Sequence, residues 1–353
     1  MNPRIEVSDL VVRYGEALAV DDISFSIQPG ELVTLLGPSG CGKTTTLRSI
    51  AGLETPTSGS IRLNGTTVFS DKERKDIPSE KRGVSMVFQS YAIWPHMTVF
   101  ENVAYGLRVR NTSKAEVESN VRRVLELVRM QDYADRPSSN LSGGQQQRVA
   151  VARAIAFSPN VILFDEPLSN LDAKLRAEMR VELRELQRQL DFTSVYVTHD
   201  QEEALAISDR VIVMSKGKIE QIGGPEEIYN HPASLFVADF VGAANMIEGE
   251  VVGKDDVGNA IFAAGGDLKL RVRSNRVGRR VALRSSYIHL VAGSGAANAI
   301  PATIHRRMFH GDFIQYIVDW PAGQLIVRRP PTEHYEEGSA VTVSFAPEHG
   351  IVL

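Results

Sequence analysis

The chain has 353 residues with one cysteine, and its 39 lysines and arginines stand against 43 aspartates and glutamates. The net charge of −4 gives no general reason for binding nucleic acid or an anionic membrane, and the single cysteine, which excludes an intrachain disulfide, fits a reducing compartment. The length is typical of two domains. The N-terminus lacks a secretory pattern, and no apolar run reaches the roughly 18 residues that span a bilayer. We therefore expect a protein that does not cross a membrane by itself.

In the first part of the chain, to about residue 240, short apolar runs predict the buried strands of a largely parallel sheet. These runs are residues 32–36, 161–164, 194–197 and 210–214. Residues 113–130 and 171–190 carry apolar side chains at helical spacing, and Ser113 with Glu116 matches a capping box at the start of the first stretch. We therefore expect this part to be a mixed α/β domain.

After about residue 245, apolar and polar residues alternate, which predicts β-strands with one buried face. The alternation covers residues 268–273, 314–320, 324–329 and 341–345. A turn at Pro321–Gly323 is expected to join the second and third of these strands, and residues 293–298 are expected to form a loop. No internal repeat is evident, and short strands between frequent glycines and prolines favour a small all-β sandwich or barrel.

A glycine-rich segment directly follows the predicted strand 32–36 and matches the pattern G-x-x-x-x-G-K-[ST]. Its residues are Gly37, Pro38, Ser39, Gly40, Cys41, Gly42, Lys43 and Thr44. Glycines let the backbone turn tightly so that its N–H groups surround phosphate oxygens, and the following helix adds its positive N-terminal end. Lys43 would reach the outer phosphates and the Thr44 hydroxyl would hold Mg²⁺. The segment predicts a site for a nucleoside triphosphate, and the alternative is an incidental glycine-rich turn.

Cys41 lies inside this segment and allows two predictions. Backbone N–H groups that point inward favour a reactive thiolate, which MgATP would protect from a maleimide reagent. The alternative is a buried and inert thiol.

A pair of carboxylates supplies the second half of such a site. Asp165 and Glu166 follow the predicted strand 161–164, so Asp165 would bind Mg²⁺ and Glu166 would orient or deprotonate the attacking water. His199 follows another predicted strand, where it would contact the γ-phosphate and stabilise charge in the transition state. The alternatives are a strand terminus or helix cap for the carboxylates and a structural role for the histidine.

The pentapeptide Leu141-Ser-Gly-Gly-Gln145 lies in the sequence between the phosphate loop and the carboxylate pair. It resembles the signature of the ABC ATPases. Further motifs of that family are matched by Gln89 in Val-Phe-Gln-Ser, by Ser169-Asn-Leu-Asp172 and by Thr198-His199-Asp200. The resemblance covers residues 5 to about 240. It implies an α/β P-loop NTPase fold for residues 1–240. These residues would form an ABC ATPase cassette with a helical subdomain at about 90–155. A small all-β, barrel-like domain over residues 241–353 follows, similar to the TOBE domain of the family.

The same resemblance implies a role for each matching residue. The phosphate loop from Gly37 to Thr44 would bind ATP, assisted by Thr45, and Tyr14 would stack on adenine. Mg²⁺ would be held by Thr44, Gln89 and Asp165. Glu166 would be the general base, with His199 and Gln89 at the γ-phosphate. The signature residues Ser142, Gly143, Gly144 and Gln145 would close over ATP held by a second copy of the chain, and Asp172 would communicate across that interface.

The remaining features resemble the importer subfamily. Residues 91–102 are similar to the segment that these subunits present to their membrane permease, and residues 236–245 are similar to the linker of the polyamine, ferric-iron and sulfate branches. Arg284-Ser-Ser-Tyr287 departs from the family's R-P-E pattern, so the β-rich domain is expected to stabilise a dimer, and a regulatory ligand is the alternative.

The resemblance therefore implies the ATP-hydrolysing subunit of a binding-protein-dependent importer for ferric iron or polyamine. It would lie on the cytoplasmic face of the inner membrane, as a homodimer bound to permease subunits that a substrate-binding protein feeds. One alternative is a soluble ABC-type ATPase that acts on nucleic acid or ribosomes. The single cassette, the absence of a heptad insertion and the net charge of −4 disfavour it. A phosphate-binding regulator without catalysis conflicts with the presence of Lys43, Asp165, Glu166 and His199.

Overall fold

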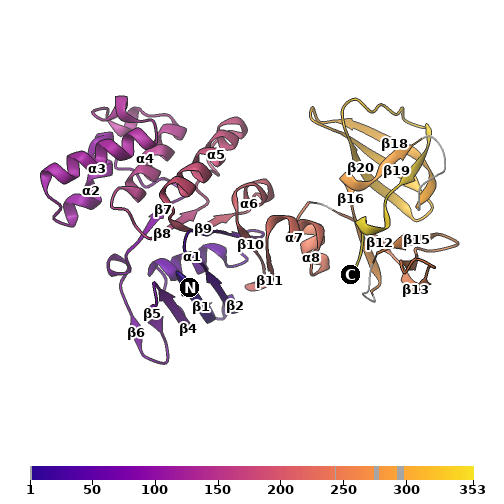
Figure 1. The fold of residues 1–353 in the computed structure, drawn as a ribbon, viewed down its shortest axis with the longest axis horizontal. Coiled ribbons are helices and arrows are strands. Elements are labelled where there is room, and N and C mark those ends of the chain that lie inside the picture. Colours follow the sequence, from indigo (N-terminus) through magenta and orange to yellow (C-terminus); the bar gives the residue numbers. More distant parts are fainter. Residues whose placement is uncertain (1, 243, 274–277, 292–297) are drawn as a thin grey trace. The chain divides into compact units, whose positions relative to one another are not determined.

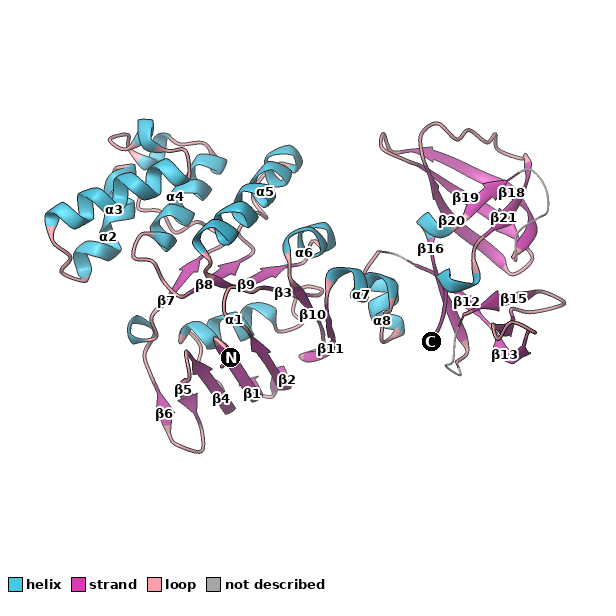
Figure 2. Ribbon diagram, in the orientation of Figure 1, coloured by secondary structure: helices cyan, strands magenta, loops and turns pink. Residues whose placement is uncertain are grey.

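The computed structural model of the chain describes residues 2–242, 244–273, 278–291 and 298–353 (Figures 1 and 2). The chain forms two compact units, Met1–Pro225 and Glu226–Leu353, and each has hydrophobic cores of its own. The loop expected at residues 293–298 lies outside the described residues except for Asn298.

A six-stranded sheet forms the centre of the first unit, with the strand order β11-β10-β3-β9-β8-β7. Its strands are β3 (Leu32–Leu36), β7 (Val84–Val87), β8 (Val161–Asp165), β9 (Thr193–Thr198), β10 (Arg210–Ser215) and β11 (Lys218–Gly223). All neighbours pair in parallel except β10 and β11, which form an antiparallel hairpin. The four strands predicted from apolar runs are confirmed, with ends that differ by at most one residue.

Both faces of this sheet are buried, as β8 illustrates. Val161 and Leu163 pack into one core, whereas Ile162 and Phe164 pack into the other, because successive side chains of a strand point to opposite faces. The core that contains Val161 also includes side chains of α1 (Lys43–Ala51). Helix α1 lies between the six-stranded sheet and a second sheet (Figure 2).

The second sheet is antiparallel, with the order β2-β1-β4-β5-β6, and was not predicted. Its strands are β1 (Ile5–Tyr14), β2 (Ala17–Ile27), β4 (Ser58–Leu63), β5 (Thr66–Ser70) and β6 (Lys75–Asp76). A short 3₁₀ helix, Ser79–Lys81, follows β6 and precedes β7.

Three helices gather at one end of the first unit (Figure 1). They are α2 (Val99–Val109), α3 (Lys114–Leu127) and α4 (Gly143–Ile155), with 3₁₀ turns at Gln131–Tyr133 and Ser138–Asn140 between the last two. Each begins with a capping box, in which the side chains of the N-cap residue and of the residue three positions later each accept a hydrogen bond from the other's backbone N–H. The pairs are Thr98 with Glu101, Ser113 with Glu116, and Ser142 with Gln145. The capping box predicted at Ser113 is confirmed.

The helix predicted at residues 171–190 is confirmed as α5 (Ala173–Leu190). It begins two residues later than its apolar pattern, because the Asp172 side chain accepts a hydrogen bond from the Leu175 N–H and caps the helix. It ends where Asp191 adopts the left-handed conformation. Helix α6 (Gln201–Ile207) is capped in the same way by Asp200.

The second unit consists mainly of antiparallel strands around one core. Its three sheets have the orders β12-β16-β22, β13-β14-β15 and β17-β21-β18-β19-β20. The strands are β12 (Ala244–Glu248), β13 (Glu250–Lys254), β14 (Ala260–Ala263), β15 (Lys269–Val272), β16 (Arg280–Arg284), β17 (His289–Val291), β18 (Ala299–Phe309), β19 (Ile314–Trp320), β20 (Gly323–Arg329), β21 (Ala340–Ser344) and β22 (Gly350–Val352). Short 3₁₀ helices occur at Ser285–Tyr287 and Pro347–His349. The four strands predicted by alternation are confirmed, including the hairpin in which Trp320 pairs with Gly323.

Two short helices, α7 (Pro225–Asn230) and α8 (Leu235–Phe240), precede these strands. Arg284 of β16 is 1% exposed and donates hydrogen bonds to the carbonyls of Tyr229, Ala238 and Val241. These bonds tie both helices to the β-strands, so the compact units divide after Pro225 rather than at the boundary of 240 that we expected. Among the described residues, no helix combines the length and the apolar character needed to cross a lipid bilayer.

Candidate nucleotide site

The phosphate loop, residues 37–44, runs from the end of β3 into the first turn of α1 and requires its glycines. A Cβ atom on Gly37 would lie 2.3 Å from the Met214 carbonyl oxygen, and one on Gly42 would lie 2.5 Å from the Ala19 carbonyl oxygen. Gly42 caps α1 at φ 102°, in the left-handed region, and contributes no side-chain hydrogen bond. The N-terminal N–H groups of α1 therefore lack a side-chain cap, which suits an anionic ligand.

Lys43 carries a buried positive charge in this loop. Its side chain is 4% exposed, and Nζ donates to the carbonyl oxygens of Gly37 at 2.8 Å and Pro38 at 2.9 Å. Within the described part of the chain, no carboxylate lies within ion-pair distance of Nζ. A buried ammonium group without a counter-charge is costly, so the loop fits a phosphate group chemically.

Cys41 is a buried thiol rather than an activated one. Its side chain is 3% exposed and packs in the core that also contains Val161 and side chains of α1. This burial raises the pKa of the thiol. The nearby Lys43 lowers that pKa, but less than burial raises it. The expectation of a favoured thiolate is therefore wrong, and the structure supports the inert-thiol alternative.

We expect a maleimide reagent to label Cys41 at least about tenfold more slowly in the folded chain than in denaturant, because burial limits both access and thiolate formation. The raised pKa also means that labelling of the folded chain should still accelerate at alkaline pH where an ordinary thiol is already ionised. Mass spectrometry over time measures both effects, and no second cysteine interferes. Fast labelling at neutral pH that MgATP suppresses would contradict this prediction.

Thr44 and Asp165 meet at the start of α1. Asp165, at the end of β8, is 4% exposed, and its Oδ1 accepts a hydrogen bond of 3.0 Å from the Thr44 hydroxyl. Arg48 Nη2 lies 3.5 Å from Asp165 Oδ2. Hydroxyl and carboxylate oxygens are the ligands that Mg²⁺ prefers, so this pair fits the metal. Arg48 was not predicted, although it lies one helical turn after Thr44 and hence on the same face of α1.

Glu166 and His199 form the next contact. Glu166 Oε2 lies 3.2 Å from His199 Nδ1, and the Glu166 side chain is 20% exposed. The backbone of Glu166 is in the left-handed region at φ 45°, held there by a hydrogen bond from its N–H to the Val197 carbonyl. A non-glycine residue in this region is strained, and such strain concentrates at functional positions. The structure thus brings together the two side chains that were predicted from separate strand ends.

Gln89 lies exposed in the turn after β7, and its carbonyl oxygen accepts a hydrogen bond of 2.9 Å from the Asn170 side chain. This contact joins the Gln89 turn to the matched motif Ser169–Asp172, in which Asn170 was given no role from the sequence. Tyr14 at the end of β1 is 49% exposed, as a stacking surface requires. Thr45 is half-buried on α1.

The segment 91–102, which resembles the part that presents itself to a permease, is only partly exposed. Tyr91 is buried, and Arg153 of α4 donates hydrogen bonds to the carbonyls of Tyr91 and Ala92 in the same turn. Trp94 is half-buried, with its ring 4.4 Å from that of Tyr105 and with Arg153 over its face. Tyr105 itself is 42% exposed.

The signature residues form the exposed start of α4. Ser142 and Gly143 are exposed, and the side chains of Ser142 and Gln145 bond to each other's backbone N–H groups at 3.4 and 3.0 Å. Gly144 is buried against Leu175 of α5, where an added Cβ would lie 2.6 Å from a leucine methyl group. These side-chain bonds remain within the helix terminus and do not reach the phosphate loop of the same chain.

Known proteins resemble the chain over nearly its whole length. Residues 20–169 match the ABC transporter family, and residues 281–353 match the TOBE domain. The Fe(3+) ions import ATP-binding protein FbpC of Rhizobium etli is 48% identical over 342 residues, which are 96% of this chain and 94% of the relative. The spermidine/putrescine import ATP-binding protein PotA of Rubrobacter xylanophilus is 41% identical over 357 residues, 99% of this chain and 93% of the relative.

A solved structure supports the fold. The protein cbiO1 from Clostridium perfringens, part of the ABC transporter complex cbiONQ, superimposes with a TM-score of 0.60 and 26% identity. The similarity covers 66% of this chain and 93% of that structure. The predicted family and the predicted fold, a P-loop ATPase cassette followed by an all-β domain, are therefore confirmed. The chain belongs to the ABC transporter family, as an ATPase subunit of its import branch with a C-terminal TOBE domain.

Proposed function

We propose that the chain hydrolyses MgATP at a site that two copies share. The observation that carries this proposal is the buried Lys43 ammonium group, which lacks a carboxylate partner among the described residues, next to the Thr44–Asp165 contact. The phosphate loop and Lys43 bind the triphosphate, with Thr45 beside them and Tyr14 stacked on adenine. Thr44, Gln89 and Asp165 would hold Mg²⁺, which would supply charge neutralisation to the phosphates.

Glu166 is the general base of the proposed reaction. Its carboxylate is partly exposed, so water can approach it, and His199 contacts Oε2 at 3.2 Å and limits its orientation. Glu166 accepts the proton of the attacking water, and His199 braces the γ-phosphate as charge develops there.

The second half of the site comes from the partner copy. Ser142 and Gly143 are exposed and Gln145 is half-buried at the start of α4, where the capping box engages the N–H groups of Ser142 and Gln145 and leaves those of Gly143 and Gly144 for an anion. We place them over ATP bound to the other copy, with Asp172 at the same interface. The β-rich unit stabilises this dimer.

The relatives support an importer that works with permease subunits, fed by a substrate-binding protein, at the cytoplasmic face of the inner membrane. The 48% identity to a protein named for Fe(3+) import favours ferric iron as the solute. Polyamine is the second candidate, because a protein named for spermidine/putrescine import is 41% identical over 99% of the chain. The net charge of −4 disfavours nucleic acid as a partner.

Reconstitution with the permease encoded beside this chain tests the solute. In vesicles that contain the complex, we expect ATP hydrolysis to rise severalfold when the binding protein is loaded with ferric iron, and not when it is offered spermidine. Iron uptake should require ATP inside the compartment that contains this chain. A complex with Glu166→Gln is the control and should take up no iron. Stimulation by spermidine alone would assign polyamine instead, and stimulation by RNA without permease would contradict the importer.

A further inference from the structure

One arginine of α5, Arg176, joins two segments of the candidate site that lie far apart in the sequence. Its Nη2 donates a hydrogen bond of 2.9 Å to the carbonyl of Leu171, the residue before Asp172. Its Nη1 donates one of 3.4 Å to Oδ2 of Asp200, the residue after His199. A guanidinium group suits this position, because its fixed fork of donors can reach a carbonyl and a carboxylate together.

A buried carboxylate of α6 also pairs with Arg176. Glu203 is 3% exposed, and its Oε1 lies 3.8 Å from Arg176 Nε. Its Oε2 accepts a hydrogen bond of 2.9 Å from the hydroxyl of Tyr196 on β9. A buried carboxylate without such partners is costly, so Glu203 and Arg176 hold each other in place between α5 and α6.

The His199 side chain depends on the backbone of its own segment, because it is 56% exposed and little packing fixes it. The next residue, Asp200, donates from its N–H to the Thr198 hydroxyl at 2.9 Å, and its Oδ1 accepts from the first N–H groups of α6. These bonds are local to the segment. Arg176 adds a contact from another helix, so it ties the His199 segment to α5.

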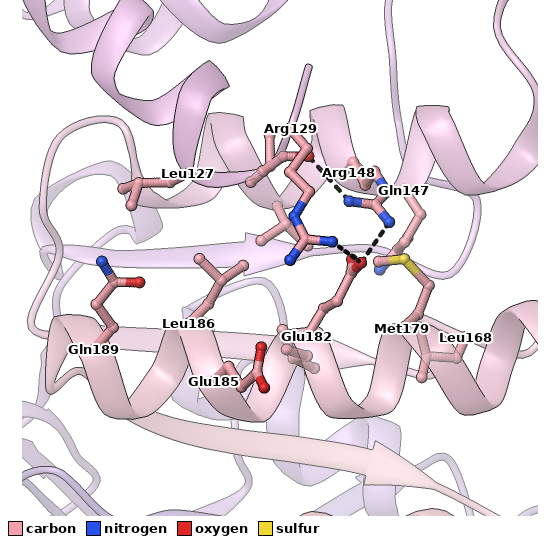
Figure 3. A pocket seen from close by; sticks show the side chains of 13 residues that line it. Leu127, Arg129, Gln147, Arg148, Leu168, Met179, Glu182, Glu185, Leu186 and Gln189 are labelled. Carbon is pink, nitrogen blue, oxygen red and sulfur yellow. Dashed lines mark hydrogen bonds and ion pairs between the residues drawn. The ribbon is translucent and has the colours of Figure 1, made fainter. Parts of the chain in front are cut away.

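Helix α5 is itself held against the signature helix α4. Glu182 of α5 lies 2.6 Å from Arg148 of α4 and 3.6 Å from Arg129, and Figure 3 shows both arginines reaching its carboxylate. Met179 and Leu183 of α5 are buried in the core that also contains side chains of α4. Arg176 therefore extends from a helix whose position is fixed by packing.

We propose that Arg176 is a positioning residue that fixes the His199 segment relative to Asp172. The role rests on the proposed function and deepens it: when two copies close over ATP at Asp172, the contacts of Arg176 keep His199 where it meets the γ-phosphate. A continuous chain of hydrogen bonds and ion pairs can carry such coupling between two segments. The role requires no contact between the guanidinium group and the nucleotide.

Arg176→Gln tests this role through the rate of hydrolysis. We expect the single-turnover rate to fall by about 10- to 100-fold, because a displacement of about 1 Å at a reacting group can cost that much. Equilibrium ATP binding should stay within about threefold of wild type, since the phosphate loop is intact.

The matched control is Arg180→Gln. Arg180 lies one turn later on α5, and its pair with Glu202 at 3.6 Å also joins α5 to α6. Among the described residues it makes no bond to Leu171 or Asp200, and Glu202 is largely exposed, so the pair contributes little. Arg180→Gln removes the same charge and should hydrolyse ATP like wild type.

Two further measurements separate positioning from a general structural role. If Arg176 acts through His199, Arg176→Gln combined with His199→Ala should hydrolyse ATP within about twofold of His199→Ala alone, because the positioned side chain is already gone. The ring ¹³C signal of His199, assigned with His199→Ala, is observed without nucleotide. It should shift in Arg176→Gln and remain in place in Arg180→Gln.

Arg176→Gln leaves the Glu203 carboxylate buried without this cation, which costs stability. If the variant does not fold, Arg176→Gln together with Glu203→Gln takes its place. The pair removes both charges, and the new amide oxygen can still accept the hydrogen bond from Tyr196.

The positioning role is overturned if Arg176→Gln hydrolyses ATP like Arg180→Gln, if its loss multiplies with that of His199→Ala, or if the His199 signal does not move. These outcomes would indicate that Arg176 only joins α5 to α6. Failure of the proposed function has a different signature, because His199→Ala and Glu166→Gln would then hydrolyse ATP like wild type. The His199 signal would still report whether Arg176 fixes the histidine.

Discussion

Replacing Glu166 by glutamine is expected to lower ATP hydrolysis by about 10²- to 10⁴-fold while leaving ATP binding nearly unchanged. Glutamine preserves the size of the side chain but cannot accept a proton from water, so the loss should fall on kcat. The 3.2 Å contact with His199 Nδ1 can persist, because the amide oxygen is still an acceptor if the ring nitrogen carries the proton. Single-turnover hydrolysis and equilibrium ATP binding measure the two quantities separately.

The matched control for this experiment is Glu126→Gln, which removes the same charge from an exposed position on α3. It should hydrolyse ATP like wild type, which excludes an effect of net charge. Turnover of Glu166→Gln within a few fold of wild type would show that another group acts as the base. Loss of ATP affinity in Glu166→Gln would instead indicate that the carboxylate organises the bound nucleotide.

Local sequence patterns predicted the elements whose formation depends on short stretches of chain. Strand β3 and strand β8 were found because a strand buried on both faces is a continuous apolar run, and α3 was found from its capping box and apolar face. The phosphate loop was found because its glycines are required locally, as the contacts of Gly37 and Gly42 show. In these cases a few consecutive residues determine the structure.

The antiparallel sheet of the first unit was missed because its pattern is interrupted. In β1, the pairing with β2 shifts register between Val7 and Leu10 and twice more before Arg13, and Asp9 adopts φ 51°. Each shift changes the face on which the following side chains lie, so the alternation that identifies a half-buried strand is lost. The neighbouring strand β4 lies more than forty residues later in the chain, which no local pattern reveals.

At the candidate site, the residue types were predictable but their contacts were not. The family motifs identified Thr44, Asp165, Glu166 and His199, and the structure adds the distances between them. Asn170 stood within a matched motif but was given no role, because its contact with the Gln89 carbonyl joins two segments that lie far apart in the sequence. For Cys41, the position in the loop suggested an activated thiol, but burial outweighs the effect of nearby Lys43.

The shared ATP site predicts that two inactive chains restore each other. Lys43→Ala removes the charge that binds the phosphates, and Ser142→Arg places a long cation where the signature would close over ATP. In a mixed dimer, one site combines the phosphate loop of the Ser142→Arg chain with the signature of the Lys43→Ala chain, so it has neither lesion. The other site has both.

Ser142→Arg also removes a helix cap, which costs about 1 kcal/mol of stability, and this effect needs a control. Ser113→Arg provides it, because Ser113 caps α3 with the same capping box and lies outside the signature. The two variants should lose similar stability in thermal unfolding. Only Ser142→Arg should lose the capture of ATP in a dimer.

Nucleotide trapping in a Glu166→Gln background is the suitable measurement, because it scores closure of a site without requiring turnover. Each inactive chain alone should retain no nucleotide through gel filtration, whereas the mixture should retain one per heterodimer, with heterodimers verified by two affinity tags. A site built within one chain would regain nothing on mixing, because each chain keeps its own lesion. Heterodimers that trap no more nucleotide than the unmixed chains would rule out the arrangement in which Ser142 of one copy closes over ATP at Lys43 of the other.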